Sequence, residues 1–477
     1  MLFTSPVFAL GFLPVALGGF WALGRAGAGK LALAWLLGAS LFFYAWWSPV
    51  FVLLLVASIT VNYLLGRLVS RRDNAACALL LAGVAADLAL LGWFKYAGFF
   101  FGVNRGAVLP LGISFFTFQQ ISFLADSYRG NQGRTVPLGY GTFVAFFPHL
   151  IAGPIVRARE IVPQLVRPGL ALLRQDEIAA GMTIFLLGLA KKLVLADTFA
   201  QFSNVGFDAA SNGAALTFFE AWYAVLAYAL QIYFDFSGYS DMAIGLARMF
   251  NIRFPLNFDS PYQALSISDF WRRWHITLGA FLRDYVYIPL GGNRRGEVRR
   301  LLNLMVTMLL GGLWHGAAWS FVLWGGLHGA YLVVHALWQR TGVALPRALA
   351  WAITLLAVIV AWVPFRAAGL AAACAMWRGM AALNGVALPR MVIGWLPALG
   401  TFAQSAGSLP YLGDGRTLSF PEATACLFLG WFIVLALPNL HRWNEAWRSR
   451  GVAASFAFAV QAMFFAPSVT PFLYFQF

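Results

Sequence analysis

Val50-Phe51-Val52-Leu53-Leu54-Leu55-Val56 begins an apolar run that continues to Leu65 without a charged side chain. About 20 such residues are needed for a helix to cross the ~30 Å hydrocarbon core of a bilayer. Comparable runs recur along the chain, with apolar centres at Leu31–Trp47, Ala75–Phe94, Ile178–Ala190, Ala214–Phe234, Leu349–Val363, Ala425–Leu437 and Val452–Phe465. Together with shorter runs interrupted by Gly or Pro, they predict about 11–13 membrane spans.

The composition of the chain indicates the same class of protein. Of 477 residues, 61% are hydrophobic and 11% are charged, whereas soluble domains carry about 25% charged residues. Lipid offers the backbone no hydrogen bonds, so a chain of this kind crosses the membrane as helices. We therefore predict an all-α, polytopic transmembrane helical bundle that forms one membrane-embedded domain over residues 1–477, with Met1–Leu23 retained as a span.

Basic residues exceed acidic residues, 33 to 18, which gives a net charge of +15. In a membrane protein such an excess is typical of loops on the cytoplasmic side, so we expect no nucleic acid partner. The basic clusters predicted to face the cytoplasm are Arg67/Arg71/Arg72, Arg157/Arg159, Lys191/Lys192 and Arg283 to Arg300.

The chain divides into three parts by the character of its spans. Residues 1–105 are plain apolar spans, residues 110–340 form a more polar and glycine-rich core, and residues 341–477 return to plain spans around a predicted periplasmic loop, Gly394–Glu422. Within the core, Pro110–Ser114, Phe147–Pro154 and Asp235–Asp241 read as interrupted backbone. Irregular backbone at membrane depth is tolerated where it lines a cavity or is buried in protein, so the core predicts a central funnel with interfacial or re-entrant helices.

Two histidines beside tryptophans stand out in this core. His315 follows Trp314 and lies 15 residues beyond Arg300, up to ~22 Å along an unbroken helix. An ionisable group near mid-membrane is a candidate functional residue, although a neutral histidine bonded to a neighbouring helix would also fit. Gly312 and Gly316, and then Gly325 and Gly329, have a spacing that lets helices approach closely.

His275 lies in Ser268–Pro289, which has the pattern of one amphipathic helix. Its aromatic face and its arginines predict a position at the membrane interface, with His275 on the border between the two faces. An interfacial anchor without chemistry is the simpler interpretation of such a helix. A border histidine next to arginines, however, could also hold a phosphate-bearing ligand.

Other polar residues of the core have two interpretations each. Asp235, Tyr239 and Asp241 could line a cavity, or the carboxylates could form a structural ion pair with Arg248 or another arginine. His328 and His335 share a helix face and are predicted to be packing groups, because no third metal ligand is spaced with them. His149 is predicted to be structural or pore-lining, and His441 to lie in a polar loop.

Six motifs of the chain belong together: Asp269–Leu278, Phe281–Arg294, Leu313–Gly316, Ile151–Arg157, Asp235–Met242 and Phe472–Phe477. They resemble the membrane-bound O-acyltransferase family, and in particular its bacterial alginate O-acetyltransferase branch. In one place the chain departs from that pattern, since Ala280 stands where the family usually has a more polar residue.

The resemblance implies a membrane funnel in which His315 is the catalytic histidine and His275 its partner. It also implies acetyl-coenzyme A as the acyl donor, no permanently bound cofactor or metal, and a bacterial inner-membrane location. Expected partners are a periplasmic SGNH-type acetyltransferase, the exopolysaccharide machinery and membrane lipid. Candidate substrate contacts are Arg272, Arg273, Trp274, Arg283, Asp284, Asn293, Arg294 and Trp314.

Two functions of another class remain open at this point. A polar, interrupted core is also typical of a substrate pathway, so a polysaccharide or lipid transporter without acyl-transfer chemistry would fit. A scaffold subunit of a polymer-export complex would fit as well.

Overall fold

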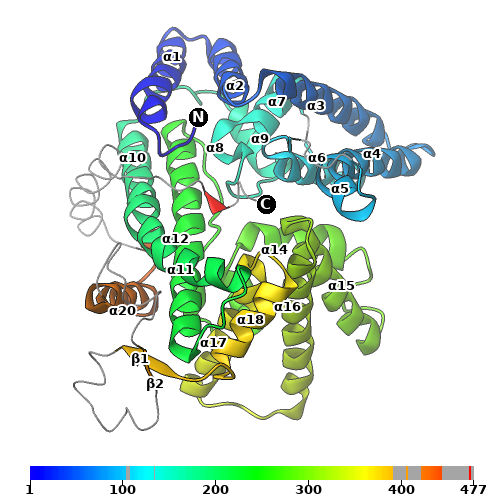
Figure 1. The fold of residues 1–477 in the computed structure, drawn as a ribbon. Coiled ribbons are helices and arrows are strands. Elements are labelled where there is room, and N and C mark those ends of the chain that lie inside the picture. Colours follow the sequence, from blue (N-terminus) through cyan, green and yellow to red (C-terminus); the bar gives the residue numbers. More distant parts are fainter. Residues whose placement is uncertain (104–107, 134, 390–403, 407–419, 443–471, 474–477) are drawn as a thin grey trace.

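The structure, a computed structural model, describes residues 1–103, 108–133, 135–389, 404–406, 420–442 and 472–473 (Figure 1). Within this part of the chain, six helical stretches are long and apolar enough to cross a membrane: Val7–Arg25, Pro49–Val69, Ala76–Phe100, Gln175–Ser211, Trp319–Thr341 and Arg347–Arg366. The predicted class, a polytopic helical bundle, is confirmed. The run Val452–Phe465 lies outside the described residues, and the total of about 11–13 spans stays a prediction.

Four helices of the N-terminal part follow the predicted apolar runs: α1 (Leu13–Arg25), α2 (Gly29–Ala45), α3 (Pro49–Val69) and α4 (Ala76–Leu91). The short helix α5 (Ala97–Phe100) ends this part, and α6 (Ile113–Arg129) is the first helix of the core. The π-helical turn Gly92–Tyr96 joins α4 to α5. In Figure 1 these helices form the upper layer of the molecule.

The core contains both long spans and short helices. These are α7 (Pro137–Ala145), α8 (Phe147–Leu150), α9 (Ala158–Leu165), α10 (Gln175–Ala190), α11 (Asp197–Ser211), α12 (Phe218–Met249), α13 (Ile267–Arg273), α14 (Ile276–Leu282), α15 (Glu297–His315) and α16 (Trp319–Trp338). The C-terminal part adds α17 (Arg347–Arg366), α18 (Leu370–Met380), α20 (Phe420–Ala436) and a parallel strand pair, β1 (Ala387–Pro389) with β2 (Gln404–Ala406).

Glycines bring α10 and α12 into backbone contact, and the two helices lie side by side in Figure 1. A methyl group at Gly188 would lie 2.6 Å from the Gly238 carbonyl oxygen, and one at Gly181 would lie 2.6 Å from the Gly245 carbonyl oxygen. This contact continues into the π-helical turn Lys191–Ala196. It brings the lysines of that turn next to the carboxylates of α12.

The prediction that Asp235–Asp241 is interrupted backbone is wrong. These residues are helical and lie inside the unbroken helix α12. Polar side chains in a membrane helix need no break in the backbone when neighbouring helices supply their partners. The other two predictions are right in part. Pro110–Gly112 lie between helices while Ile113 and Ser114 begin α6, and Ile151–Pro154 lie between helices while Phe147–Leu150 form a short helix, α8.

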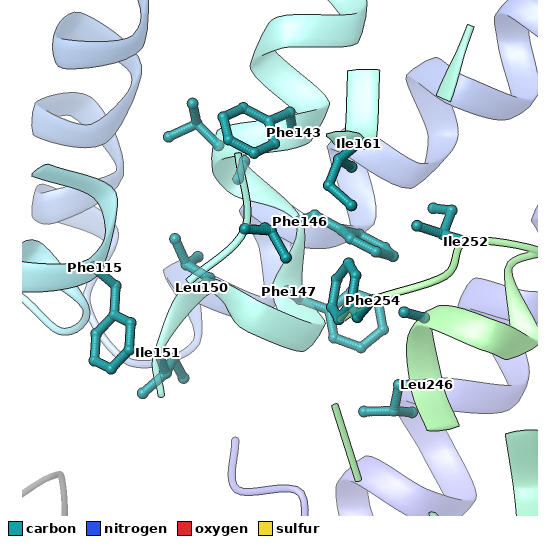
Figure 2. Close-up of a cluster of buried hydrophobic side chains, with 14 of the residues drawn as sticks. Phe115, Phe143, Phe146, Phe147, Leu150, Ile151, Ile161, Leu246, Ile252 and Phe254 are labelled. Carbon is teal, nitrogen blue, oxygen red and sulfur yellow. The ribbon is translucent and has the colours of Figure 1, made fainter. Parts of the chain in front are cut away.

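A cluster of phenylalanines packs the turn from α7 through α8 (Figure 2). Phe146 has an extended backbone and ends α7, and Phe147 and Pro148 begin α8. The rings of Phe146 and Phe254 lie 5.9 Å apart and nearly perpendicular. This apolar packing fixes the loop that follows α8, whose residue Ile155 contacts the candidate site.

The single amphipathic helix predicted over Ser268–Pro289 is also wrong. The chain forms α13, leaves the helical conformation at Trp274 and His275, and resumes as α14. The Ile276 N–H donates to the Asn257 carbonyl at 3.0 Å, outside the helix. A tertiary hydrogen bond thus replaces a helical one at this break.

The predicted loop Gly394–Glu422 is described only in part. Residues 404–406 form β2, and Phe420–Glu422 are already helical within α20. The rest of this segment lies outside the described residues.

Candidate active site

His275 lies at the break between α13 and α14 in a left-handed backbone conformation, with φ at 44° and ψ at 52°. This conformation costs a non-glycine residue roughly 1–3 kcal/mol, and such strain clusters at functional sites. The side chain is 0% exposed. The predicted position on the border of an interfacial helix is therefore wrong, because the broken backbone turns His275 into the protein.

Asn257 fixes the orientation and the tautomer of His275. The Thr277 N–H donates to Asn257 Oδ1 at 3.3 Å, and the Thr277 hydroxyl donates to the same atom at 2.9 Å. Because a backbone N–H can only donate, the Asn257 atom at this point is its oxygen. His275 Nδ1 lies 3.1 Å from that oxygen, so Nδ1 carries the proton. In the neutral ring, Nε2 then bears the lone pair.

His315 is the last residue of α15, which runs unbroken from Glu297. Side chains from the segment after α4 cap this helix end. Tyr96 donates to the Leu313 carbonyl at 2.8 Å, and Lys95 Nζ donates to the carbonyls of Trp314 at 2.5 Å and His315 at 3.2 Å. A cation at a helix C-terminus also stabilises the helix dipole. Lys95 and Tyr96 thereby hold the backbone that carries His315.

The two imidazoles lie close together in an aromatic enclosure. Their ring centroids are 6.4 Å apart, and His315 is 3% exposed. The rings of Trp324 and Phe365 lie 5.0 Å and 5.1 Å from that of His315. Buried imidazoles surrounded by aromatic rings form a site from which bulk water is excluded, and in such a site an uncharged base is favoured.

The close approach of α15 and α16 that the glycine spacing predicts is confirmed. A methyl group at Gly312 would collide with the Phe321 carbonyl oxygen, and one at Gly325 with the Met308 carbonyl oxygen. The two helices therefore touch through their backbones. This contact places Trp324 of α16 against His315 of α15.

A pocket of about 280 Å³ lies between α14 and the first turns of α15. Arg283, Arg300, His335 and Trp271 are among its lining residues. Of the predicted substrate contacts, only Arg283 is among those lining residues. The rim can bind an anion, because two guanidinium groups and an imidazole face the same space.

A second pocket, of about 300 Å³, lies toward the other end of α15. Its lining includes Tyr44, Trp47, Pro110 and Ser114. Ser114 connects it to the end of α15, since Lys95 Nζ lies 3.4 Å from the Ser114 hydroxyl and also donates to the His315 carbonyl. Neither histidine of the pair is among the lining residues of these two pockets; the basic pocket contacts α15 from Arg300 to Met308, and the second pocket lies near the end of α15 that carries His315.

The other predicted substrate contacts are dispersed. Arg273 pairs with Asp269 at 3.0 Å, and Arg272, Asn293 and Arg294 are exposed. Trp274 is buried and packs 4.8 Å from the ring of Trp362. Trp314 is buried and stacks on Phe118. The two tryptophans shape the enclosure.

Asp284 belongs to a network of arginines beside the basic pocket. It accepts hydrogen bonds from Arg283 at 2.7 Å and pairs with Arg157 at 2.8 Å. Burial alone would raise the pKa of Asp284, but the hydrogen bonds from Arg283 and Arg157 outweigh burial and lower it. Asp284 is thus an anionic partner of these arginines, and it orients Arg283 at the pocket.

Asp235 and Asp241 form ion pairs with lysines, and the predicted pairing with Arg248 is wrong. Lys192 lies 2.8 Å from Asp235, and Lys191 lies 2.6 Å from Asp241, whereas Arg248 pairs with Glu177. Lys192 is 1% exposed. The prediction that Lys191 and Lys192 face the cytoplasm as a basic loop is therefore wrong as well.

The same carboxylates hold distant segments of the chain. The Leu473 N–H donates to Asp235 Oδ2 at 3.0 Å, and His441 Nε2 lies 2.8 Å from Asp241 Oδ1. The Tyr239 ring stacks on Phe3 at 5.0 Å. These three residues of α12 therefore contact segments near both ends of the chain, and His441, predicted to lie in a polar loop, has a buried carboxylate as its partner.

The sequence did not reveal two residues of this region, Asn257 and Lys95, or the position of a third, Arg300, at the pocket. Asn257 precedes His275 by 18 positions, and Lys95 precedes His315 by 220. Neither has a spacing that connects it to a histidine. Arg300 was assigned only to a basic cluster. A lysine next to an apolar span, as in Lys95, was the one available signal, since buried cations in membranes require partners.

Comparison with known proteins connects this geometry to an enzyme family. The model of the membrane-bound O-acyltransferase family matches residues 111–376, a range that contains both histidines. The chain belongs to the membrane-bound O-acyltransferase family. It is 44% identical over 430 residues to a peptidoglycan O-acetyltransferase of Helicobacter pylori, covering 81% of each protein.

Two further relatives carry names of the alginate pathway. A probable alginate O-acetylase of Pseudomonas aeruginosa is 44% identical over 399 residues, covering 80% of this chain and 75% of the relative. One of Pseudomonas putida is 39% identical over 513 residues, covering the whole of both proteins. The protein is accordingly a multi-pass membrane O-acyltransferase.

Proposed function

We propose that this O-acyltransferase moves acetyl groups from cytoplasmic acetyl-coenzyme A, across the bacterial inner membrane, toward a polysaccharide outside. The observation that carries the proposal is the pair of buried imidazoles, His275 and His315, whose ring centroids are 6.4 Å apart. The names of the relatives, which are O-acetyltransferases and probable O-acetylases, favour acetyl as the group transferred.

His315 acts as the general base in this proposal. It takes the proton of the acceptor hydroxyl while the hydroxyl oxygen attacks the thioester carbon. The carbon–sulfur bond then breaks, and the same proton goes to the leaving thiolate. A positioned general base contributes ~10²–10⁴-fold to such a reaction.

His275 has the role of orienting His315. Because Nδ1 of His275 donates to Asn257, its neutral ring offers a lone pair at Nε2 and cannot donate to the thioester carbonyl. That lone pair can accept an N–H of His315 and so leave the other His315 nitrogen free of a proton. His275 would thereby hold the base, His315, in one tautomer, as the third residue of a catalytic triad does for its histidine.

The basic pocket is the proposed entry for the donor. Arg283 and Arg300 offer guanidinium groups for the phosphates of coenzyme A. Its location beside the cluster Arg294–Arg300 agrees with a cytoplasmic orientation by the positive-inside rule. The pocket near Ser114, toward the other end of α15, is then the approach for the acceptor.

The acceptor is a hydroxyl of an exopolysaccharide such as alginate or of a periplasmic SGNH-type acetyltransferase that passes the group on. A cell-wall polysaccharide is the alternative acceptor, favoured by the similarity to the peptidoglycan O-acetyltransferase. Family membership disfavours a transporter without chemistry.

The test compares His315→Ala with the unchanged protein in producing cells and after purification. We expect secreted polymer without acetyl groups by mass spectrometry, and no acceptor-dependent thiol release from acetyl-coenzyme A. His149→Gln is the matched control, because His149 is equally buried but contacts Gln119 and phenylalanines away from the pair. Polymer acetylation that survives in folded His315→Ala protein would refute the assignment.

A further inference from the structure

A third buried histidine lies one aromatic ring away from the proposed base. His328 of α16 is 0% exposed. Neither of its ring nitrogens has a hydrogen-bond partner in the part of the chain that the structure describes. Its ring lies 4.8 Å from that of Trp324 and 5.2 Å from that of Trp271.

The two tryptophans share this lack of partners. The Nε1–H groups of Trp271 and Trp324 are buried, and neither donates a hydrogen bond to an acceptor among the described residues. A buried polar group without a partner costs about 1–3 kcal/mol, whereas an apolar group of the same shape would avoid the cost. These three side chains are in ring contact with one another, so together they are candidates for hydrogen bonds to one bound group.

These side chains connect the basic pocket to His315. Trp271 lines that pocket, and the rings of Trp271 and Trp324 are 5.8 Å apart. The ring of Trp324 lies 5.0 Å from that of His315. A donor that extends from the pocket toward His315, as the proposed function requires, therefore meets Trp271 and then Trp324.

The polar atoms of Trp271, Trp324 and His328 define the chemistry of a group that could bind them. Each indole contributes one N–H donor and no acceptor, and a neutral imidazole contributes one of each. Donors therefore outnumber acceptors, three to one. Such a set is complementary to an oxygen with two lone pairs, and best of all to one that gains negative charge.

We infer that His328, with the indole N–H groups of Trp271 and Trp324, binds the carbonyl oxygen of the acyl thioester. This inference rests on the proposed function and assigns an oxyanion site to it. When the acceptor oxygen bonds to the carbonyl carbon, the π electrons of the carbonyl move onto this oxygen. They return when the carbon–sulfur bond breaks and the thiolate leaves with the proton held by His315.

Electrostatics make these donors effective during the reaction. In a low-dielectric enclosure, donors that are already oriented stabilise the developing charge without reorganisation, and removing one such donor costs ~10²–10³-fold in kcat. Phe270 stacks on His328 with centroids 6.0 Å apart and the planes inclined by 11°, which holds the imidazole in place. His328 is accordingly a substrate-contacting residue of the site.

The test is His328→Phe, which keeps an aromatic ring and removes both nitrogens. We expect a melting temperature equal to or above that of the unchanged protein, because neither ring nitrogen of His328 has a hydrogen-bond partner among the described residues. We expect kcat for acetyl transfer to fall at least 100-fold with the donor KM nearly unchanged, the result of an interaction made only in the transition state. His328→Gln, which keeps a donor, should recover part of kcat.

The matched control is His149→Phe. His149 is also 0% exposed, but its Nδ1 lies 2.8 Å from Gln119 Nε2, so this change should lower the melting temperature and leave kcat of the folded protein unchanged. Full activity of His328→Phe overturns the inference, and so does a raised donor KM with unchanged kcat. Failure of His328→Phe to fold overturns it as well, because it shows a structural partner.

A separate readout distinguishes this inference from the proposed function. The acyl content of polymer from cells is measured for His315→Ala and His328→Phe side by side. If His315→Ala leaves acylation intact while His328→Phe reduces it, the assignment of the base fails and the oxyanion site stands. If only His315→Ala reduces it, the base stands and the oxyanion site fails.

Discussion

At the scale of single residues, the candidate site depends on a conformation that sequence patterns do not favour. His275 has a positive φ without being glycine, and its left-handed backbone interrupts what reads as one helix. The strain is compensated by hydrogen bonds that gather on Asn257, which accepts from His275, from the Thr277 N–H and from the Thr277 hydroxyl. The orientation of one imidazole is thus determined by an amide 18 positions earlier in the chain.

This dependence gives the first residue-scale prediction. Asn257→Ala removes the acceptor of His275 Nδ1–H, so the ring can take the other tautomer, in which Nε2 carries the proton. We expect kcat to fall roughly 10–100-fold, less than the ~10²–10⁴-fold that a positioned base contributes in full, with a smaller change in donor KM. Steady-state kinetics on the purified protein measure both quantities.

Asn384→Ala is the control for that change. Asn384 also donates one side-chain hydrogen bond, to the Leu216 carbonyl at 2.9 Å, far from the histidines in the chain. It should keep the activity of the unchanged protein. If Asn257→Ala is fully active, or if it loses activity only because the folded fraction falls, Asn257 does not position His275.

Some residues of the site could be predicted from the sequence and others could not. His275 and His315 were found through their motif, and Arg283 through its charge. Asn257 and Lys95 were not found, because each acts through a contact that forms only when distant helices pack. Lys95, for example, contacts the end of α15 across a sequence separation of 220 positions, and no local pattern predicts such a pairing.

At the scale of elements, the α15–α16 pair is the unit that brings His315, Trp324 and His328 together. Its glycine spacing could be read from the sequence, and the backbone contact followed as predicted. The break between α13 and α14 could not be predicted from the sequence, because the hydrophobic pattern of one helix continues through it. In α12 the error was the opposite one. A break was predicted at Asp235–Asp241 because these residues are polar, but the helix is unbroken since other segments supply their partners.

Gly325→Ala should separate these two helices. A methyl group at this position meets the Met308 carbonyl oxygen, which is backbone and cannot rotate away. Overpacking of this kind costs typically 1–3 kcal/mol, so we expect a lower melting temperature and, because Trp324 shifts relative to His315, a loss of acetyl transfer. Thermal unfolding and kinetics of the purified variant test this.

The next residue supplies the control. A methyl group at Gly326 would lie 3.7 Å from Leu309 Cδ2, an ordinary contact distance. Gly326→Ala should therefore be stable and active. Equal behaviour of the two variants would mean that the close contact at Gly325 is not what fixes the pair.

At the scale of the whole molecule, buried charges connect segments that are far apart in sequence. Lys192 pairs with Asp197 at 2.6 Å and with Asp235 at 2.8 Å, and Asp235 in turn accepts from the Leu473 N–H. The sequence placed Lys192 on the surface because lysines beside an apolar span usually mark the cytoplasmic loop. Lys192 faces Asp235 inside the protein because α10 and α12 pack backbone to backbone, and this packing could not be predicted from the local sequence.

The last prediction concerns this network. Lys192→Met keeps the length of the side chain but leaves Asp197 and Asp235 buried without their cation. Removing one partner of a buried ion pair costs about 3–5 kcal/mol, because the remaining charge is uncompensated. We expect a strongly lowered melting temperature, while the protein that stays folded keeps its kcat, since the network lies outside the histidine pair.

Lys30→Met, at an exposed lysine, should change neither quantity. An unchanged melting temperature of Lys192→Met would show that the carboxylates are neutral in the folded protein and that apolar packing, rather than charge, holds the C-terminal residues against α12.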